Sequence, residues 1–331
     1  MGAVRPPAAA SATPLSIEGG PADRIGFRTP SIGTRDTSAN KEHIMPIDLK
    51  TALGAELPTQ EFSWTPSDVQ LYHLGLSAGT RWTDPGELRY LDDREPQVLP
   101  TFATVAPTMR VTEPPKVSYP GVEIDLAKVV HGSQEIVVHR PIPAEGKASS
   151  TGRITEVWDK GSAAVIAHET VITGSDGQPL WTARSSIFAK GEGGFGGERG
   201  PSTKAALPDR TPDFEVLTPT LPQQALLYRM CGDRNPLHSD PEFARAAGFP
   251  NPILHGLCTY GLVCKTATDT VLDSDASRVT GFRARFAGVL YPGETIRSRI
   301  WREGDELVIG ATVVEREDAP VLSDVRLSFT A

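Results

Sequence analysis

The chain has 331 residues, with 41 acidic and 33 basic side chains that give a formal net charge of −8 at pH 7. Proteins whose main partner is nucleic acid usually present a basic face to the phosphates, so this charge argues against such a partner. The longest uncharged apolar stretch, Pro252 to Cys264, is too short to span a bilayer, which excludes an integral membrane protein.

The first 44 residues differ in composition from the rest of the chain. They are rich in Ala, Pro, Ser, Gly and Thr and show neither apolar periodicity nor a signal-peptide apolar region. We interpret residues 1–44 as a flexible leader, or as sequence translated upstream of a start at Met45. Three cysteines without disulfide-framework spacing indicate a reducing compartment, so we expect a cytoplasmic protein.

From Met45 onward, two halves show the same order of features. In each half a proline is followed six residues later by a tyrosine, Tyr72 or Tyr228, across a short apolar-periodic run. The sequences Val98-Leu99-Pro100-Thr101 and Ile253-Leu254-His255-Gly256 then each precede a mostly apolar stretch of helix length. These stretches predict one helix in each half.

Strand-like segments close each half. They contain many β-branched residues and are separated by Gly, Pro and Asp turns. The predicted strands are 135–138, 152–158, 163–173 and 180–189 in the first half, and 281–290, 295–302, 306–315 and 321–329 in the second. We therefore predict an α+β protein with two repeats, residues 45–190 and 211–331, each a central helix wrapped by an antiparallel β-sheet.

A Gly- and Pro-rich segment, residues 191–210, separates the repeats. Its first part, residues 191–197, looks like a phosphate-binding glycine loop, but such a loop must open a helix. The following residues include Gly200, Pro201 and Pro208 and carry no helix signal. We interpret the whole segment as a flexible linker.

The main candidate site contains Asp233 and His238. On a helix these side chains would diverge, but Gly232 and Pro236 indicate a bent loop, because a residue before proline avoids helical angles. In this loop a carboxylate and an imidazole can converge, with the amide of Asn235 between them. Around one water they form a proton-transfer site near neutral pH. The alternative is a helix-capping Asp followed by a solvated His.

Gly256 is a second candidate. Asn251 before Pro252 is a helix-start signal, so we predict a helix that begins near Pro252. The first N–H groups of such a helix are unpaired, and glycine lets a ligand approach the backbone closely. Gly256 could therefore donate its N–H to a developing oxyanion, or it could simply permit close helix–sheet packing. We expect His255 to be a structural neighbour rather than a catalyst.

These motifs resemble the hydratase 2 motif of the MaoC-like (R)-specific enoyl-CoA hydratases. The similarity lies in residues 232–244 and 252–259, and in residues 130–132, 157–161, 285–288 and 291–293, which follow the family's order. From Met45 onward the chain resembles the two-repeat form, also found as a domain of peroxisomal multifunctional enzymes. The resemblance implies a double hot-dog fold in which the second repeat keeps the catalytic loop and the first, with residues 72–77 at that position, has lost it.

The resemblance also implies a reaction, the reversible addition of water to a trans-2-enoyl-CoA to give the (3R)-3-hydroxyacyl-CoA. Asp233 and His238 would hold the water and share the proton transfers, Asn235 would orient the loop, and the N–H of Gly256 would bind the thioester oxygen. The expected substrate-binding residues are His131, Gly132, Lys160, Arg234, Pro236, Leu237 and Phe286. Ser133 departs from the family, where an acidic residue is expected. The reaction requires no metal and no cofactor.

Several alternatives remain open. A hot-dog acyl-CoA thioesterase would hydrolyse the CoA ester without needing the paired Asp–His loop, and a (3R)-hydroxyacyl-thioester dehydratase would act on a carrier-protein substrate. A metal site of Cys231, His238, His255 and Cys258 fits no familiar zinc spacing. A non-catalytic acyl-CoA carrier would not need the Asp–His pair. The expected partner is an acyl-CoA thioester, and the two-repeat form is compatible with a homodimer.

Overall fold

The computed structural model describes residues 47–331 except 116–117, 125–127 and 203–205. Met45–Ala331 form one compact unit, whereas the predicted leader, residues 1–44, lies outside the described residues. Within the part of the chain that the structure describes, no helix combines the length and the apolar character that a membrane span requires.

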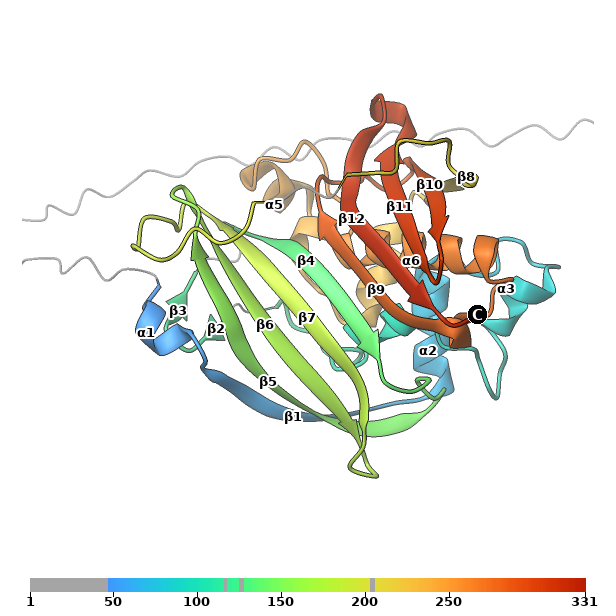
Figure 1. The fold of residues 1–331 in the computed structure, drawn as a ribbon, viewed down its shortest axis with the longest axis horizontal. Helices are drawn as coiled ribbons and strands as arrows, with labels where there is room; N and C mark the ends of the chain where they lie inside the picture. The colour runs from blue at the N-terminus through green and yellow to red at the C-terminus, as the bar shows by residue number, and fades with distance from the viewer. Residues whose placement is uncertain (1–46, 116–117, 125–127, 203–205) are drawn as a thin grey trace, which may run out of the picture. The chain divides into compact units, whose positions relative to one another are not determined.

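A ten-stranded sheet dominates this unit, with the strand order β1-β5-β6-β7-β4-β9-β12-β11-β10-β8 (Figure 1). Its strands are β1 (Glu56–Trp64), β4 (Val129–Val138), β5 (Gly146–Asp159), β6 (Ala163–Gly174), β7 (Pro179–Lys190), β8 (Phe214–Pro219), β9 (Val279–Phe286), β10 (Thr295–Glu303), β11 (Glu306–Val313) and β12 (Ala319–Phe329). A small second sheet pairs β2 (Ser118–Tyr119) with β3 (Val122–Glu123).

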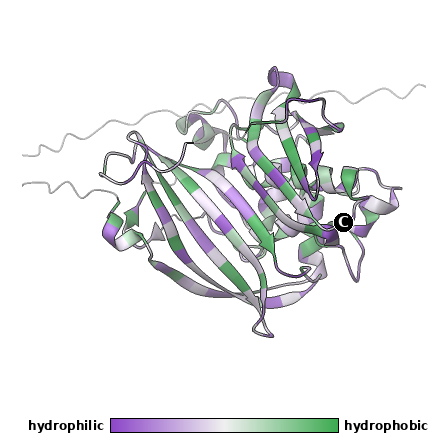
Figure 2. Ribbon diagram, viewed as in Figure 1, coloured by the Kyte–Doolittle hydropathy of each residue, from purple (hydrophilic) through white to green (hydrophobic). Residues whose placement is uncertain are grey.

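The α-helices are α1 (Leu49–Ala52), α2 (Pro66–Gly75), α3 (Pro85–Arg89), α4 (Gln224–Tyr228), α5 (Pro241–Ala246) and α6 (Gly256–Val271). Short 3-10 helices are η1 (Pro100–Thr104), η3 (Arg229–Cys231), η4 (Pro236–His238), η5 (Ala276–Arg278) and η6 (Val314–Arg316). The long helix α6 packs on β8, β9, β10 and β12 of the second repeat. Figure 2 shows apolar and polar residues in alternation along the strands, as expected for strands with one face toward a core.

Both repeats use the same strand arrangement. The order β1-β5-β6-β7-β4 in the first repeat has its equivalent in β8-β10-β11-β12-β9 of the second. The two halves join where β4 pairs with β9 in antiparallel register, with Ile136 opposite Phe282. Tyr72 and Tyr228, which the sequence placed at equivalent positions, have ring centroids 6.1 Å apart. The predicted α+β architecture of two repeats is confirmed.

Of the strands in the large sheet, β1 and β8 were not predicted from the sequence. They lie at the two edges of the sheet, and most of their residues are exposed or only partly buried. An edge strand that buries so little lacks the alternation of apolar and polar residues that identifies a strand in a sequence. The eight predicted strands are present, but β4 and β5 each begin six residues earlier than predicted and β9 ends four residues earlier.

The helix predicted after Leu99 is not present. Residues 100–104 form the short element η1, and turns continue to residue 110. Pro107 lies within this stretch and cannot donate a helical backbone hydrogen bond. The space near η1 contains aromatic side chains instead, with Phe102 in edge contact with Trp64 and Tyr72. The first repeat is therefore a hot-dog unit without a long central helix.

The connection between the repeats is partly fixed. The carboxylate of Asp159, at the end of β5, accepts hydrogen bonds of 2.8 Å from the N–H groups of Gly161, Gly194 and Gly196. The N–H of Asp159 donates to the carbonyl oxygen of Glu198 at 2.7 Å. Hydrogen bonds thus attach the first part of the predicted flexible linker, residues 191–210, to the turn between β5 and β6.

His73 is fully buried in α2 of the first repeat. Its Nδ1 donates to the carbonyl oxygen of Tyr90 at 3.0 Å, and its Nε2 accepts from the N–H of Leu99 at 3.2 Å. Both bonds require the neutral ring. Burial lowers the pKa of His73 from 6.5 to about 3.

We expect this histidine to make the protein sensitive to acid. The unfolded chain takes up a proton near pH 6.5 and the folded chain only near pH 3, so acidification favours the unfolded state. At about 1.4 kcal/mol per pH unit, His73 should lower the free energy of unfolding by roughly 2 kcal/mol between pH 6.5 and pH 5. Urea unfolding at both pH values should show a smaller pH dependence in His73→Gln, and an equal dependence would contradict this account.

Candidate active site

The candidate site begins at a sharp turn after α4. Element η3 ends at Cys231, and Gly232 has a φ of 103°, a left-handed conformation that glycine tolerates. The backbone of Thr108, from the first repeat, lies so close that a Cβ on Gly232 would overlap its carbonyl oxygen. The turn therefore needs glycine, and it directs the chain into the loop that carries Asp233.

Asn235 shapes this loop through its own backbone and side chain. Its Oδ1 accepts from the N–H of Leu237 at 3.0 Å and so caps η4. Its N–H donates to Oδ1 of Asp233 at 3.1 Å. Pro236 starts η4, so the bent loop expected from Gly232 and Pro236 is present.

His238 is held as a neutral base. Its Nδ1 donates to the carbonyl oxygen of Ile253 at 2.8 Å, which leaves the lone pair on Nε2. The residue is only 8% exposed. Burial lowers the pKa of His238 below 6.5, while the carboxylate of Asp233 opposes this shift. His238 is therefore uncharged at neutral pH and has one ring nitrogen free to accept a proton.

His255 contacts both Asp233 and His238, and the sequence had led us to expect a structural neighbour of this pair. Its ring stacks on His238 with centroids 3.7 Å apart and an interplanar angle of 29°. Its Nε2 donates to the main-chain oxygen of Asp233 at 3.3 Å. Burial, and then the neighbouring His238, lower the pKa of His255 well below 6.5. The positive charge of Arg229 also lowers the pKa of His238.

These three residues could also be considered as metal ligands. Asp233, His238 and His255 place a carboxylate oxygen and two ring nitrogens within 4.8 Å of one another. A carbonyl oxygen accepts from one nitrogen of each ring, which leaves the other nitrogen of each ring with its lone pair. Cys231 and Cys258, the other ligands considered, are buried thiols outside this group. The same groups can transfer protons, and the absence of a metal requirement stays a prediction.

Helix α6 begins at Gly256 and not near Pro252, so the predicted start was wrong. Ile253 and Leu254 stay extended because their N–H groups donate to carbonyl oxygens elsewhere, 3.3 Å from the oxygen of Leu237 and 2.7 Å from that of Leu290. No side chain caps the N-terminus of α6. Gly256 therefore occupies the first helical turn, where N–H groups lack intrahelical partners and the helix dipole is positive.

The aromatic ring of Phe286 covers Gly256. A Cβ on Gly256 would lie 3.0 Å from this ring, so a side chain there would displace it. His131, on β4, meets the same ring at a centroid distance of 5.0 Å, and its Nε2 lies 2.8 Å from Oγ of Ser185. Burial lowers the pKa of His131 to about 4. The structure thus brings His131 and Phe286, both predicted to bind substrate, beside Gly256.

Gly132 lies at a bulge of β4, between His131 and Ser133. A Cβ on Gly132 would lie 2.7 Å from the hydroxyl of Ser186, so the strands pack closely here. Ser133, which replaces the acidic residue expected from the family, places its hydroxyl 2.7 Å from that of Ser186. Ser133 therefore contributes a neutral hydroxyl pair to this part of the site.

The remaining predicted residues have different surroundings. Leu237 packs in a small apolar cluster with Ala244 and Ile253, so its side chain belongs to the core of the loop. Nη1 of Arg234 lies 3.6 Å from the sulfur of Met230. Lys160 lies in the turn after β5, with its Nζ 2.9 Å from the carbonyl oxygen of Pro201.

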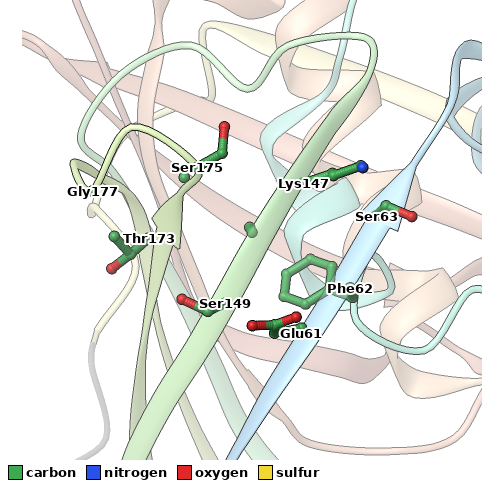
Figure 3. Close-up of a pocket in the computed structure, with 10 residues that line it drawn as sticks. Glu61, Phe62, Ser63, Lys147, Ser149, Thr173, Ser175 and Gly177 are labelled. Atoms are coloured by element: carbon green, nitrogen blue, oxygen red, sulfur yellow. The ribbon is translucent and has the colours of Figure 1, made fainter.

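A surface hollow of about 590 Å³ lies elsewhere, between β1, β5 and the end of β6 (Figure 3). Glu61, Phe62, Lys147 and Thr173 are among the residues that line it. Lys147 is near the start of β5, whereas Lys160 follows its end. The hollow includes none of the residues predicted for the site, so it is separate from the candidate active site.

Comparison with known proteins identifies the family. Residues 203–321 match the MaoC like domain, and residues 62–191 match the MFE-2 hydratase 2 N-terminal domain. The chain is 59% identical to enoyl-CoA hydratase ChsH3 of Mycobacterium tuberculosis over 86% of this chain and 99% of that protein. It is 36% identical to the peroxisomal enoyl-CoA hydratase 2 of Arabidopsis thaliana, over 80% and 90%.

Solved structures agree with this result. A MaoC-like dehydratase from Phytophthora capsici has a TM-score of 0.76 at 28% identity and covers 86% of this chain and 98% of that one. A Mycobacterium tuberculosis protein described as a double hotdog fold has a TM-score of 0.52 at 12% identity, which supports the fold alone. The double hot-dog fold is therefore confirmed. The chain belongs to the MaoC-like hydratase 2 family, and it is a hydro-lyase.

Proposed function

We propose that this protein is an (R)-specific 2-enoyl-CoA hydratase, which adds water reversibly to trans-2-enoyl-CoA and gives (3R)-3-hydroxyacyl-CoA. The observation that carries the proposal is the convergence of Asp233 and His238 next to the uncapped N-terminus of α6. The stacked ring of His255 connects the two, because His255 precedes Gly256 directly and contacts His238.

The geometry suggests a division of roles. One water binds between the carboxylate of Asp233 and the free Nε2 of His238, and these groups remove its proton as oxygen attacks C3. The pair returns a proton to C2, so that H and OH add across the double bond. Negative charge that develops on the thioester oxygen is stabilised by the N–H of Gly256 at the positive end of α6.

The first repeat serves this single site rather than a second one. Aligned on Tyr72 and Tyr228, the first repeat has Ser77 and Trp82 at the positions of Asp233 and His238, so the Asp–His pair is not repeated there. Instead the first repeat contributes His131 beside Phe286. The proposed substrate places the enzyme in acyl-CoA and lipid metabolism; a cytoplasmic location, a homodimer and independence of cofactors remain predictions.

A second candidate function shares the same chemistry in the opposite direction. The chain is 36% identical over 301 residues to a protein of Mycobacterium tuberculosis named 3-hydroxyacyl-thioester dehydratase Y. Dehydration of a hydroxyacyl thioester, on CoA or on a carrier protein, would use the same Asp–His pair. The identity of the thioester carrier therefore separates the two candidates.

Hydration of crotonyl-CoA tests the proposal directly. We expect the absorbance of the enoyl thioester to fall without release of free thiol, and chiral analysis to identify the (3R)-hydroxy product. Free thiol would indicate a thioesterase, and a (3S) product would contradict the proposed stereochemistry. Turnover of a crotonyl carrier protein, with none of crotonyl-CoA, would favour the carrier-protein dehydratase.

A further inference from the structure

The inner face of the first repeat is partly polar, whereas that of the second is apolar. In the second repeat, strand residues such as Ile309 and Leu327 share one core with Leu262 of α6. In the described part of the first repeat no long helix covers the sheet, and the strands place histidine, serine and glutamine side chains on the inner face. A polar face that is not filled by a helix can accept a ligand that carries polar groups.

The strand register places His168 on this inner face, because consecutive residues of a strand point to opposite sides of the sheet. One row across β4, β7, β6 and β5 consists of Gln134, Ser185, His168 and Ile154. Ile154 is fully buried in an apolar cluster on the inner side. Arg184, in the adjacent row, lies on the outer side, where it forms ion pairs of 3.0 and 2.8 Å with two partly exposed carboxylates. The row of His168 therefore faces the interior of the repeat.

Ser185 connects this row to the candidate active site. Its Oγ lies 2.8 Å from Nε2 of His131. The ring of His131 is in turn 5.0 Å from the ring of Phe286, which covers Gly256. His168 lies directly opposite Ser185 on the next strand. Polar side chains thus continue from the proposed thioester-binding end of the site into the first repeat.

His168 has a ring nitrogen available for a ligand. The ring of Tyr119 lies against it, with centroids 5.7 Å apart. The Nδ1 of His168 is buried and has no hydrogen-bond partner among the described residues, whereas the residue as a whole is partly exposed. Burial lowers the pKa of His168 below 6.5, so the ring is neutral at neutral pH. Because a buried N–H without a partner is rare and costly, we assign the proton to Nε2, which can donate to an oxygen.

The strand geometry gives the distance from His131 to His168. His131 shares a row with Ile166 of β6, and the two strand spacings from β4 to β6 amount to roughly 10 Å. The two residues from Ile166 to His168 add roughly 7 Å along β6. The Cα atoms of His131 and His168 are therefore about 12 Å apart in a flat approximation of the sheet. An extended chain advances about 1.2 Å per bond, so about ten bonds span this distance.

We propose that Nε2 of His168 donates a hydrogen bond to an oxygen on the distal part of the acyl group, and that His168 thereby selects among substrates. The preferred substrate is an enoyl thioester with a hydroxyl or keto oxygen near its tenth carbon, rather than an unsubstituted chain. The inference rests on the proposed function, because it names the acyl portion of that substrate. A site that hydrogen-bonds a polar group rejects the analogue without it, because the polar atoms of the site are then left unpaired.

Two substrates of equal chain length test this inference, 10-hydroxy-trans-2-decenoyl-CoA and trans-2-decenoyl-CoA. In the wild type we expect a lower KM for the hydroxylated substrate. His168→Leu removes the donor and should raise this KM by about 3- to 10-fold, the effect of one lost hydrogen bond. KM for trans-2-decenoyl-CoA should not rise. Because His168 is remote from C2 and C3, kcat should stay close to the wild-type value for both substrates.

His168→Gln and His139→Leu are the matched variants. Glutamine keeps an N–H donor, so His168→Gln should restore part of the preference for the hydroxylated substrate. His139 belongs to the same repeat, but its Nε2 already pairs with Oγ1 of Thr182 at 2.9 Å, so His139→Leu should leave both KM values unchanged. Crotonyl-CoA is too short to reach His168, and every variant should hydrate it equally well. Thermal unfolding should confirm that each variant is folded.

Two results would overturn the inference: an unchanged ratio of the two KM values in His168→Leu, or an equal rise of both. Calorimetric binding of 10-hydroxydecanoyl-CoA and decanoyl-CoA, which have no double bond to hydrate, keeps this test independent of catalysis. If the wild type hydrates no enoyl thioester, the proposed function fails. A weaker Kd of His168→Leu for the hydroxylated ligand alone would then still support the role of His168. Equal changes of both Kd values, or no binding of either ligand, would reject it.

Discussion

Asp233→Asn and His238→Ala should each lower kcat for crotonyl-CoA by at least about 100-fold, the usual effect of losing a general acid or base. The change at Asp233 keeps the shape of the side chain and an oxygen that can accept the N–H of Asn235, a bond of 3.1 Å in the native loop. It removes only the ability to hold and exchange a proton. The change at His238 removes the free Nε2.

Stopped-flow or steady-state hydration assays measure these losses, and thermal unfolding shows whether the fold survives. Asp240→Asn is a suitable control, because Asp240 lies close in sequence but caps α5 by accepting from the N–H groups of Glu242 and Phe243. It should retain most of the activity. Turnover near the wild-type level in either Asp233→Asn or His238→Ala would refute the proposed mechanism.

Gly232→Ala should cause a large loss of both stability and activity. Alanine at a φ of 103° is strained, and its Cβ would overlap the carbonyl oxygen of Thr108. Because this oxygen belongs to a backbone, it cannot move aside as a flexible side chain could. We expect the free energy of unfolding to fall by more than about 3 kcal/mol, the range in which backbone strain and overpacking combine.

Gly248→Ala separates strain from steric overlap. Gly248 also has a positive φ, 88°, but a Cβ there would meet no atom within 4 Å. It should cost only about 1–2 kcal/mol, the penalty of a left-handed conformation for a residue with a Cβ. Urea unfolding of both variants provides the comparison. Equal losses would show that the contact with Thr108 is unimportant.

The loop that carries Asp233 and His238 could be predicted from the sequence, since Gly232, Asn235 and Pro236 each determine the backbone conformation of only a few neighbouring residues. The bent loop between Asp233 and His238 follows from their conformational preferences alone. The interaction of His255 with His238 could not be predicted in this way, because it depends on the approach of α6 to the loop. The only local sign of this interaction is the position of His255 directly before Gly256, where α6 starts.

Hydrogen bonds between residues distant in sequence explain the other differences between the predicted and the observed structure. The start of α6 moved to Gly256 because the N–H of Leu254 pairs with Leu290, a partner from a distant turn. The connection between the repeats looked flexible because its anchor, Asp159, lies more than thirty residues earlier in the chain. Strand β1 was missed since an edge strand buries little. In each case the determining group is remote in sequence, where periodicity and propensity carry no information.

The pairing of β4 with β9 makes the two repeats depend on each other for stability. Because these strands pair with each other, each repeat supplies a hydrogen-bonding partner for the last strand of the other. Loss of either repeat would expose an unpaired strand edge. The first repeat also supplies Thr108, whose backbone lies against the turn at Gly232. The first repeat therefore acts as a scaffold without which the loop of Asp233 would lose both a neighbouring strand pairing and a backbone support.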